Sequence, residues 1–214
     1  MQPNFRKDST HTLCYSTPYP MRFITARDFL TPVVGIACKH VTWYGSGEQS
    51  HKSFREETPK NSMHDRLHTL QSILHHEIPL TRHLGLKVES YDGQCLTLRA
   101  PIAPNINHKS TAFAGSLNAV MTLAGWGLIW LLLDDTDLAG TIVIQRSDTR
   151  YVLPVRDDFI ARCQKPSAEE IARFVATLRS RGKARLELAV EVLQEGKLAV
   201  AFSGRYVAHG HKRE

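Results

Sequence analysis

The feature that most constrains this chain is a nearly uninterrupted apolar run over residues 117–133. A run of this length is at the short end of what crosses a bilayer as a helix. It holds Asn118, Thr122 and two glycines, however, and amphipathic, charged segments surround it. A helix that is apolar on every side also forms the buried core of soluble folds. We therefore expect no membrane contact, but a core helix over about residues 115–133 that a sheet or a second subunit must cover all round.

The segments around this run show the periods of short helices and strands. Asp92-Gly93 is a hairpin turn signal, and Ser167 with Glu170 forms a capping box at the start of a helix that Gly182 closes. The predicted helices are 65–77 and 167–181, and the predicted strands are 84–91, 95–100, 141–151, 158–164, 184–193 and 198–208. This order predicts an α+β fold, with a curved, largely antiparallel sheet wrapped around the long central helix.

Residues 1–62 differ from the rest of the chain. They mix Pro, Ser, Thr, His and Tyr without a long hydrophobic period, so they can hardly bury a core of their own. We expect either a disordered or irregular extension or the product of a mis-assigned start codon upstream of Met63. The folded domain is predicted to cover residues 63–214.

Charge and composition limit the classes of partner. The chain carries 27 Lys and Arg against 21 Asp and Glu, a formal net charge of +6. This modest excess suits a phosphorylated ligand such as coenzyme A. The aromatic residues, 8% of the chain, are not interleaved with a basic stripe, which argues against nucleic acid. The four cysteines form no C-x-x-C pair, so we expect no metal site and free thiols in a reducing cytoplasm.

Six short segments between residues 77 and 154 carry a resemblance to a known family. They are Glu77-Ile-Pro-Leu-Thr-Arg-His-Leu-Gly85, Asp92-Gly93, Ala103-Pro-Asn-Ile-Asn-His-Lys-Ser-Thr-Ala-Phe-Ala-Gly-Ser-Leu117, Leu123-Ala-Gly-Trp-Gly127, Ile142-Val-Ile-Gln145 and Arg150-Tyr-Val-Leu-Pro154. Over nearly all of residues 63–214 the chain resembles the thioesterase family named for the C-terminal domain of the YiiD protein, a branch of the HotDog superfamily. Residues 1–62 show no such resemblance.

The resemblance implies a HotDog fold and a homodimer, or a dimer of dimers, whose two sheets join edge to edge. It also implies hydrolysis of an acyl-CoA or acyl-carrier-protein thioester, in a cleft at the dimer interface near the N-terminus of the central helix. No cofactor is implied beyond the coenzyme A that is part of the substrate.

The start of the central helix is the first candidate for the chemistry. A thioester hydrolase must polarise a carbonyl group, position a water molecule and move a proton. A helix N-terminus offers free backbone N–H groups and the positive end of the dipole. Ala114, Gly115 and Ser116 lie at this point. We expect the Gly115 N–H to be the oxyanion donor; the alternative is that Gly115 only permits close packing of the helix on the sheet.

The loop before this helix should face the same cleft. Asn107 is a candidate to orient water or the carbonyl, and His108 is a candidate general base because imidazoles exchange protons near neutral pH. Thr111 is expected either to bind substrate or to cap the helix. Each residue has a structural alternative, since Asn is common in turns and His108 could simply be solvated.

One departure from the family pattern concerns the central helix. Many HotDog thioesterases carry an Asp or Glu seven residues after the first glycine, but here that position is Thr122. The helix has no carboxylate between Phe113 and Leu133, which leaves Ser116, Asn118 and Thr122 as its polar groups. Asp148 reaches the cleft only if its strand points it toward the helix.

Two more expectations concern ligands and function. Arg179, Lys183 and Arg185 either contact the nucleotide of coenzyme A or form a solvated face at a helix C-terminus. The missing carboxylate favours a second function, a non-catalytic acyl-CoA-binding module. It argues against a third, a HotDog dehydratase or hydratase, whose chemistry uses a His with a helix carboxylate.

Overall fold

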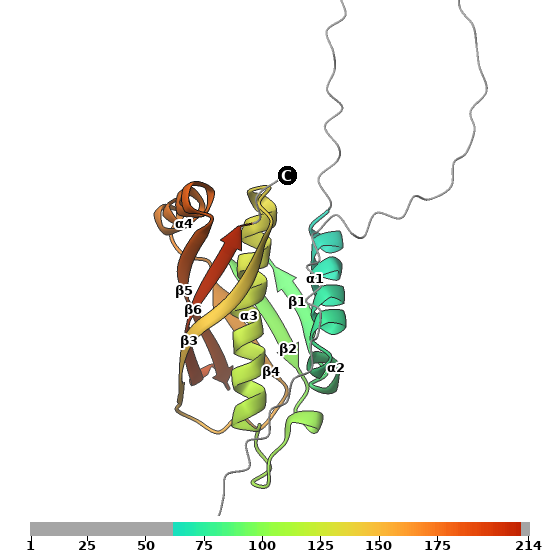
Figure 1. Cartoon of the computed structure of the whole chain (residues 1–214). Helices are drawn as coiled ribbons and strands as arrows, with labels where there is room; N and C mark the ends of the chain where they lie inside the picture. Colours follow the sequence, from blue (N-terminus) through green and yellow to red (C-terminus); the bar gives the residue numbers. More distant parts are fainter. Residues whose placement is uncertain (1–61, 211–214) are drawn as a thin grey trace, which may run out of the picture. The chain divides into compact units, whose positions relative to one another are not determined.

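The computed structural model describes residues 62–210, and the predictions for residues 1–61 lie outside this range. Figure 1 shows the order of the elements along the chain. In chain order they are α1 (Met63–Glu77), α2 (Leu80–His83), β1 (Lys87–Tyr91), β2 (Cys95–Ala100), the 3-10 helix η1 (Ala103–Asn105), α3 (Ala114–Asp135), β3 (Gly140–Tyr151), β4 (Phe159–Gln164), α4 (Ala168–Arg181), β5 (Lys183–Gln194) and β6 (Lys197–Gly210).

Local signals account for the ends of the helices. The Ser167–Glu170 capping box opens α4 as predicted, and Gly182 closes it in the left-handed conformation with φ 65°. Helix α1 begins two residues before its predicted start, because Ser62 and Asp65 form a second capping box. Helix α2 was not predicted; it is a single turn that begins directly after Pro79.

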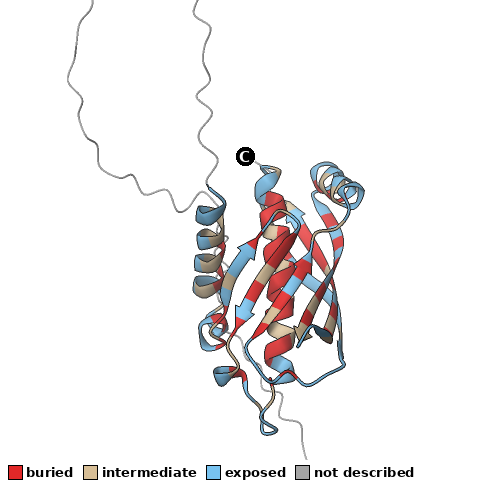
Figure 2. Cartoon of the chain, turned by 180° about the vertical axis from the view of Figure 1, so that it is seen from behind, coloured by how far each residue is buried: buried red, intermediate tan, exposed pale blue. Residues whose placement is uncertain are grey.

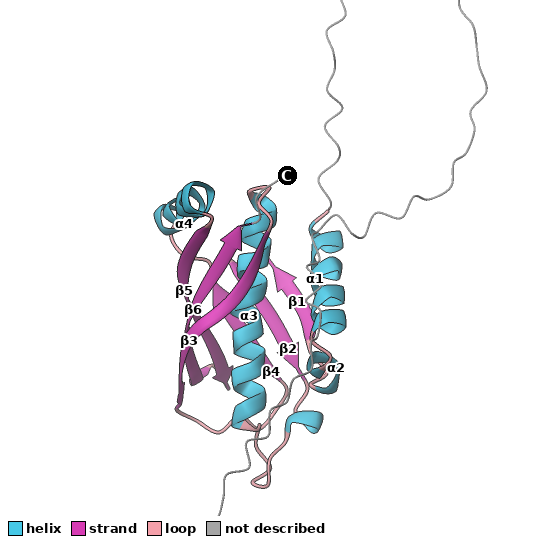
Figure 3. Cartoon of the chain, viewed as in Figure 1, coloured by secondary structure: helices cyan, strands magenta, loops and turns pink. Residues whose placement is uncertain are grey.

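A single six-stranded sheet surrounds the long helix. The strand order is β1-β2-β4-β5-β6-β3, and every neighbouring pair is antiparallel. The sheet curves around α3, while α1 lies beside β1 and α4 lies at one end of β5 (Figure 3). Buried and exposed residues alternate along the strands (Figure 2), as strands with one core-facing side require. The predicted α+β fold with an antiparallel sheet around a central helix is confirmed.

Helix α3 is the core of the fold, but the described part of the chain does not cover it completely. Among residues 62–210 it is the one helix long and apolar enough to cross a membrane, and 72% of its apolar window is buried inside the protein. The burial of α3 against the sheet explains why so long a run of residues is apolar. One stripe along α3 is only half-buried, and its members are Asn118, Ala119, Thr122, Trp126 and Trp130. The stripe runs beside β3, since the Trp126 Nε1–H donates to the Ile142 carbonyl across 3.2 Å.

The two edges of the sheet differ. At the β1 edge, the Gln71 side chain of α1 accepts from the Val88 N–H and donates to the carbonyl oxygen of Leu86 across 3.1 Å. At the opposite edge lies β3, whose Val143 and Ile144 are 43% and 37% exposed. Helix α1 therefore covers the β1 edge, whereas β3 is a long open edge with exposed apolar side chains.

Candidate active site

The N-terminus of α3 has free donors, as the sequence predicted. The N-cap residue Phe113 is extended, with φ −67° and ψ 131°, and makes no side-chain cap. Leu117 is the first residue of the helix whose N–H finds a carbonyl, that of Phe113 at 3.1 Å. Within residues 62–210, the N–H groups of Ala114, Gly115 and Ser116 have no hydrogen-bond partner. These three groups and the helix dipole make this end of α3 attractive to an oxyanion.

Gly115 has a role that neither sequence-based alternative described. A Cβ atom at this position would lie 2.3 Å from Cε1 of Phe113, so the glycine leaves room for the Phe113 ring. That ring is 55% exposed and lies over the first turn of α3. The side chain of Ser116, by contrast, is almost completely buried. An aromatic ring at the surface therefore flanks the free N–H groups.

The loop before α3 is held by the side chain of Asn107. Its Oδ1 accepts from the N–H groups of Lys109 at 2.8 Å and Thr111 at 3.3 Å. Its Nδ2 donates to the Thr111 hydroxyl at 3.0 Å and the Ala112 carbonyl at 3.3 Å. Both ends of the Asn107 amide are thus engaged within the loop. His108, at the tip, is exposed, and Thr111 is a partner of Asn107 and does not cap the helix.

Asn105 is a structural residue that the sequence analysis missed. It is 1% exposed, and its Nδ2 donates to the carbonyls of Leu84 at 2.8 Å and Pro101 at 2.7 Å. Its own carbonyl accepts from the Phe113 N–H at 2.7 Å. Asn105 thereby fixes where α3 begins. No spacing in the sequence distinguishes this Asn from Asn107, two residues later.

Strand β3 contributes two further residues that were not predicted. The Thr149 hydroxyl donates to Asn118 Oδ1 across 2.8 Å, and the Tyr151 hydroxyl donates to the Ala114 carbonyl across 3.0 Å. Partial burial raises the pKa of Tyr151 above its ordinary value, so it remains a neutral donor. The first two turns of α3 are therefore attached to β3.

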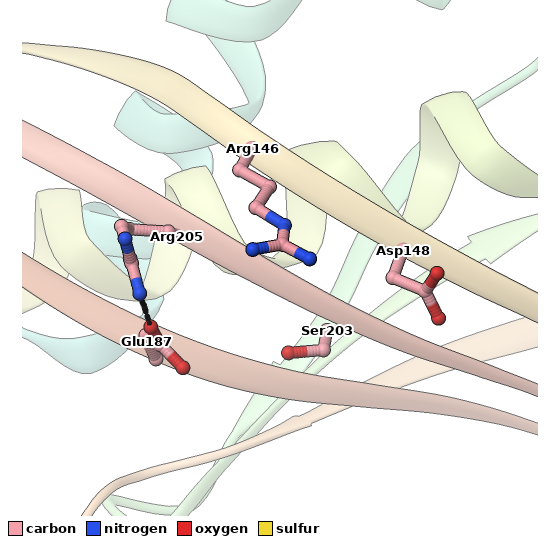
Figure 4. A pocket seen from close by; sticks show the side chains of 5 residues that line it. All are labelled: Arg146, Asp148, Glu187, Ser203 and Arg205. Atoms are coloured by element: carbon pink, nitrogen blue, oxygen red, sulfur yellow. Dashed lines mark hydrogen bonds and ion pairs between the residues drawn. The ribbon is translucent and has the colours of Figure 1, made fainter.

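Asp148 lies on the other side of the sheet. It lines a polar hollow of about 230 Å³. Figure 4 shows it there with Arg146, Glu187, Ser203 and Arg205. The reason is an irregularity in β3 between Ile144 and Arg146, which shifts the register against β6. Before the irregularity, the even-numbered residue Ile142 is buried. After it, the even-numbered residues of β3 face away from α3, and the odd-numbered Thr149 faces α3. Within the chain, the structure does not bring Asp148 to the start of α3.

The predicted basic residues lie near the opposite end of α3. Arg179 donates to the carbonyl of Thr136, just after the helix, across 3.1 Å. Arg185 donates to Gln145 Oε1 across 3.3 Å, and Lys183 is exposed at the start of β5. A helix the length of α3 spans about 33 Å. Within the chain these cations are therefore separated from the free N–H groups by most of the length of α3.

The middle of α3 also bears on the site. Thr122, seven residues after Gly115, is half-buried, and its side chain makes no hydrogen bond within residues 62–210. Its carbonyl accepts from the hydroxyl of Tyr206. Asn118 and Thr122 thus form the polar part of the half-buried stripe, one and two turns after Ala114.

Comparison with known proteins gives the family. Residues 67–210 match the family described as "Putative thioesterase (yiiD_Cterm)". A protein of unknown function from Chlorobaculum tepidum is 31% identical, with a TM-score of 0.68 over 72% of this chain and 100% of its own. A "putative thioesterase" from Shewanella oneidensis is 33% identical, with a TM-score of 0.63 over 69% and 99%. A thioesterase from Haemophilus influenzae, 15% identical with a TM-score of 0.50 over 67% and 90%, shares the fold. The chain therefore belongs to the YiiD C-terminal-domain family of thioesterase-like HotDog proteins.

Proposed function

We propose that this chain hydrolyses acyl thioesters of coenzyme A or of an acyl-carrier protein at the N-terminal end of α3. The observation that carries the proposal is the uncapped start of this helix, where three backbone N–H groups lack a partner within residues 62–210. A developing oxyanion is the kind of group that such preorganised donors stabilise. Membership of a thioesterase family supports this assignment.

In the proposed reaction, a water molecule attacks the carbonyl carbon and the electron pair of the C=O bond moves onto oxygen. The Gly115 N–H donates to this oxyanion. His108 accepts the proton of the attacking water and passes it to the thiolate that leaves when the C–S bond breaks. The products are a carboxylic acid and a free thiol. Asn107 and Thr111 act indirectly, because their hydrogen bonds shape the loop that carries His108.

We further propose that the active form is a homodimer joined through β3. Strand β3 is open, exposes Val143 and Ile144, and lies beside the half-buried stripe of α3. A two-fold axis next to β3 would extend the sheet and give the stripe a cover. In this arrangement the acyl chain lies along Ala114, Asn118 and Thr122, with Ser116 behind them, at the interface.

The same symmetry suggests how the basic residues could serve the ligand. A two-fold axis that stands perpendicular to the sheet at the β3 edge makes the two α3 helices run antiparallel on the same face. The C-terminal end of one α3 then lies on the same side as the N-terminal start of the other. Arg179, Lys183 and Arg185 of a second subunit are therefore our candidates to contact the nucleotide of coenzyme A.

The cysteines support a cytoplasmic location for this activity. Cys95 and Cys163 are buried free thiols. Burial raises the pKa of each thiol above its ordinary value, so both remain protonated and unreactive. Two thiols without a disulfide suit a reducing compartment.

A non-catalytic acyl-CoA-binding module is the second candidate function. Two observations favour it: α3 has no carboxylate between Phe113 and Leu133, and both ends of the Asn107 amide are engaged in the loop. Such a module would bind the thioester and leave it intact.

Thiol release from acyl-CoAs of increasing chain length, together with a binding titration of coenzyme A, separates the two candidates. The hydrolase is expected to show saturable turnover that falls by about 10²-fold or more in His108→Ala, the usual effect of losing a general base. Asn107→Ala should lower turnover with the fold and dimer intact. Binding without turnover, on coenzyme A and carrier-protein thioesters alike, would establish the binding module.

A further inference from the structure

The side chain of Asn118 is held at only one of its two ends. Its Oδ1 accepts the Thr149 hydroxyl across 2.8 Å. Its Nδ2, which carries two N–H donors, has no acceptor within residues 62–210. Asn107 forms a contrast, because both ends of its amide are engaged by the loop. The Nδ2 group of Asn118 is therefore the end of this amide that remains available to a ligand.

The position of Asn118 directs the free end toward the start of α3. Asn118 follows Ala114 by four residues and Gly115 by three, so all three share a face of the helix. Helical side chains lean toward the N-terminus and cover the preceding turn. The Asn118 amide therefore lies over the turn that holds the free N–H of Gly115. Asn118 is half-buried, so a ligand can reach it.

Strand β3 supports this turn at two points. Thr149 holds the Asn118 side chain, and Tyr151, two residues later on the same face of β3, donates to the Ala114 carbonyl across 3.0 Å. Threonine is branched at Cβ and stiff at χ1, which suits a group that must hold another in one orientation. The contact fixes the amide so that its oxygen is occupied and its N–H₂ group is free.

We infer that Asn118 is a second oxyanion donor of the proposed hydrolase and that Thr149 is its positioning residue. This inference rests on the proposed function. The Asn118 Nδ2–H and the Gly115 N–H donate together to the oxygen that becomes negative as water adds to the thioester carbonyl. A neutral amide stabilises this charge without a carboxylate on the helix. Loss of the Thr149 hydroxyl lets the amide turn and present its oxygen, which repels an oxyanion.

Loss of either side chain is expected to change kcat and KM to different degrees. A donor used chiefly in the transition state changes kcat and leaves KM nearly constant. Asn118→Ala is expected to lower kcat by about 10²–10³-fold, the usual loss for one oxyanion donor. Thr149→Val, which keeps the shape but not the hydroxyl, is expected to lower kcat by about 10–10²-fold through misplacement of the amide. Thr149→Ser keeps the hydroxyl and should restore most of the rate.

The test measures thiol release by the full chain from the acyl-CoA that the wild-type protein turns over fastest. Thr97→Val is the matched control, because Thr97 also lies on a strand and shares a hydrogen bond with Ser90 at 2.7 Å, away from α3. Thermal unfolding of each variant identifies losses due to stability. The expected result is a lower kcat in Thr149→Val, rescue in Thr149→Ser and a wild-type rate in Thr97→Val.

Two results would overturn the inference in different ways. Wild-type turnover with an equal kcat in Thr149→Val, or a loss that Thr149→Ser does not restore, would remove Asn118 and Thr149 from the mechanism but keep the hydrolase. No turnover by the wild-type protein on any thioester would reject the proposed function, and the inference with it.

Discussion

The hydroxyl group of Tyr206, on β6, donates a hydrogen bond to the carbonyl of Thr122, in α3, across 2.8 Å. The Tyr206 ring is fully buried and lies against Gly125, where a Cβ atom would be only 2.3 Å from the hydroxyl oxygen. Burial also raises the pKa of Tyr206, so the hydroxyl remains a donor. This contact fixes the distance between the sheet and the helix that carries the candidate site.

Gly125→Ala should therefore destabilise the fold severely. The Tyr206 ring has no free space to move into, and overpacking of this kind costs about 3 kcal/mol of unfolding free energy. Gly127→Ala is the matched control. Its Cβ would meet the flexible side chains of Leu96 at 3.1 Å and Leu70 at 3.3 Å, which can yield. Urea unfolding measures both, and equal losses would contradict the role given to Tyr206.

Arg66 should stabilise the C-terminal end of α3. Its Nε lies 2.7 Å from Asp134 Oδ2, off the line of a hydrogen bond, and its Nη2 lies 2.8 Å from Asp135 Oδ1. Its Nη2 also donates to the carbonyl of Leu131 across 3.2 Å. Two carboxylates at a helix C-terminus are unfavourable with the dipole, and Arg66 offsets them.

Arg66→Met is expected to lower the unfolding free energy by about 1–2 kcal/mol, since the two carboxylates are partly exposed and screened by water. In a protein that carries Asp134→Asn and Asp135→Asn, Arg66→Met should lower the unfolding free energy by a smaller amount. A double-mutant cycle from chemical unfolding gives the difference. The same cost in both backgrounds would show that Arg66 acts through packing alone.

A charge on the open edge of the sheet should separate the proposed dimer. Ile144 is 37% exposed on β3, and lysine there places an unpaired ammonium group in the interface. Ile144→Lys is expected to shift the molar mass in light scattering from dimer to monomer. Leu80→Lys, at a 54% exposed position on α2, is the control and should leave the dimer intact. A monomeric wild-type protein would contradict the proposed assembly.

Asp92 gives the fold a specific dependence on acid pH. The N–H groups of Cys95 and Gln94 hold the pKa of the Asp92 carboxyl below its ordinary value of 3.8. Its contribution to stability is therefore complete above pH 3.8 and is lost as the pH falls through the lower pKa of the folded state. In Asp92→Asn, the unfolding free energy should fall less steeply as the pH decreases through this range. An unchanged slope would exclude Asp92 as its source.

The fold could be predicted from local patterns because those patterns agree with the tertiary structure. Residues 184–193 alternate strictly, and β5 buries the predicted side of that alternation against α3. The Ser167–Glu170 box and Gly182 fix both ends of α4. The long apolar run had to be covered on most sides, which the curved sheet does.

The site was harder to predict because it depends on a single irregularity. Strict alternation from buried Ile142 would turn Asp148 toward α3, but the shifted register after Ile144 turns Thr149 inward instead. Strand propensity carries no signal for such a shift. In the same way, Asn105 acts through a hydrogen bond to the carbonyl of Leu84, 21 residues earlier in the chain, that no sequence period reveals.

The central claim is thioester hydrolysis at the N-terminus of α3, and steady-state thiol release by Gly115→Pro tests it most directly. Proline is tolerated in the first turn of a helix but removes the N–H donor. Gly115→Ala is the matched control, because it adds the same Cβ atom beside the Phe113 ring but keeps the N–H. The account predicts saturable turnover in the wild type and a loss in kcat for folded Gly115→Pro that is about 10²–10³-fold greater than in Gly115→Ala. Equal turnover in Gly115→Pro and Gly115→Ala, or none in the wild type, would contradict it.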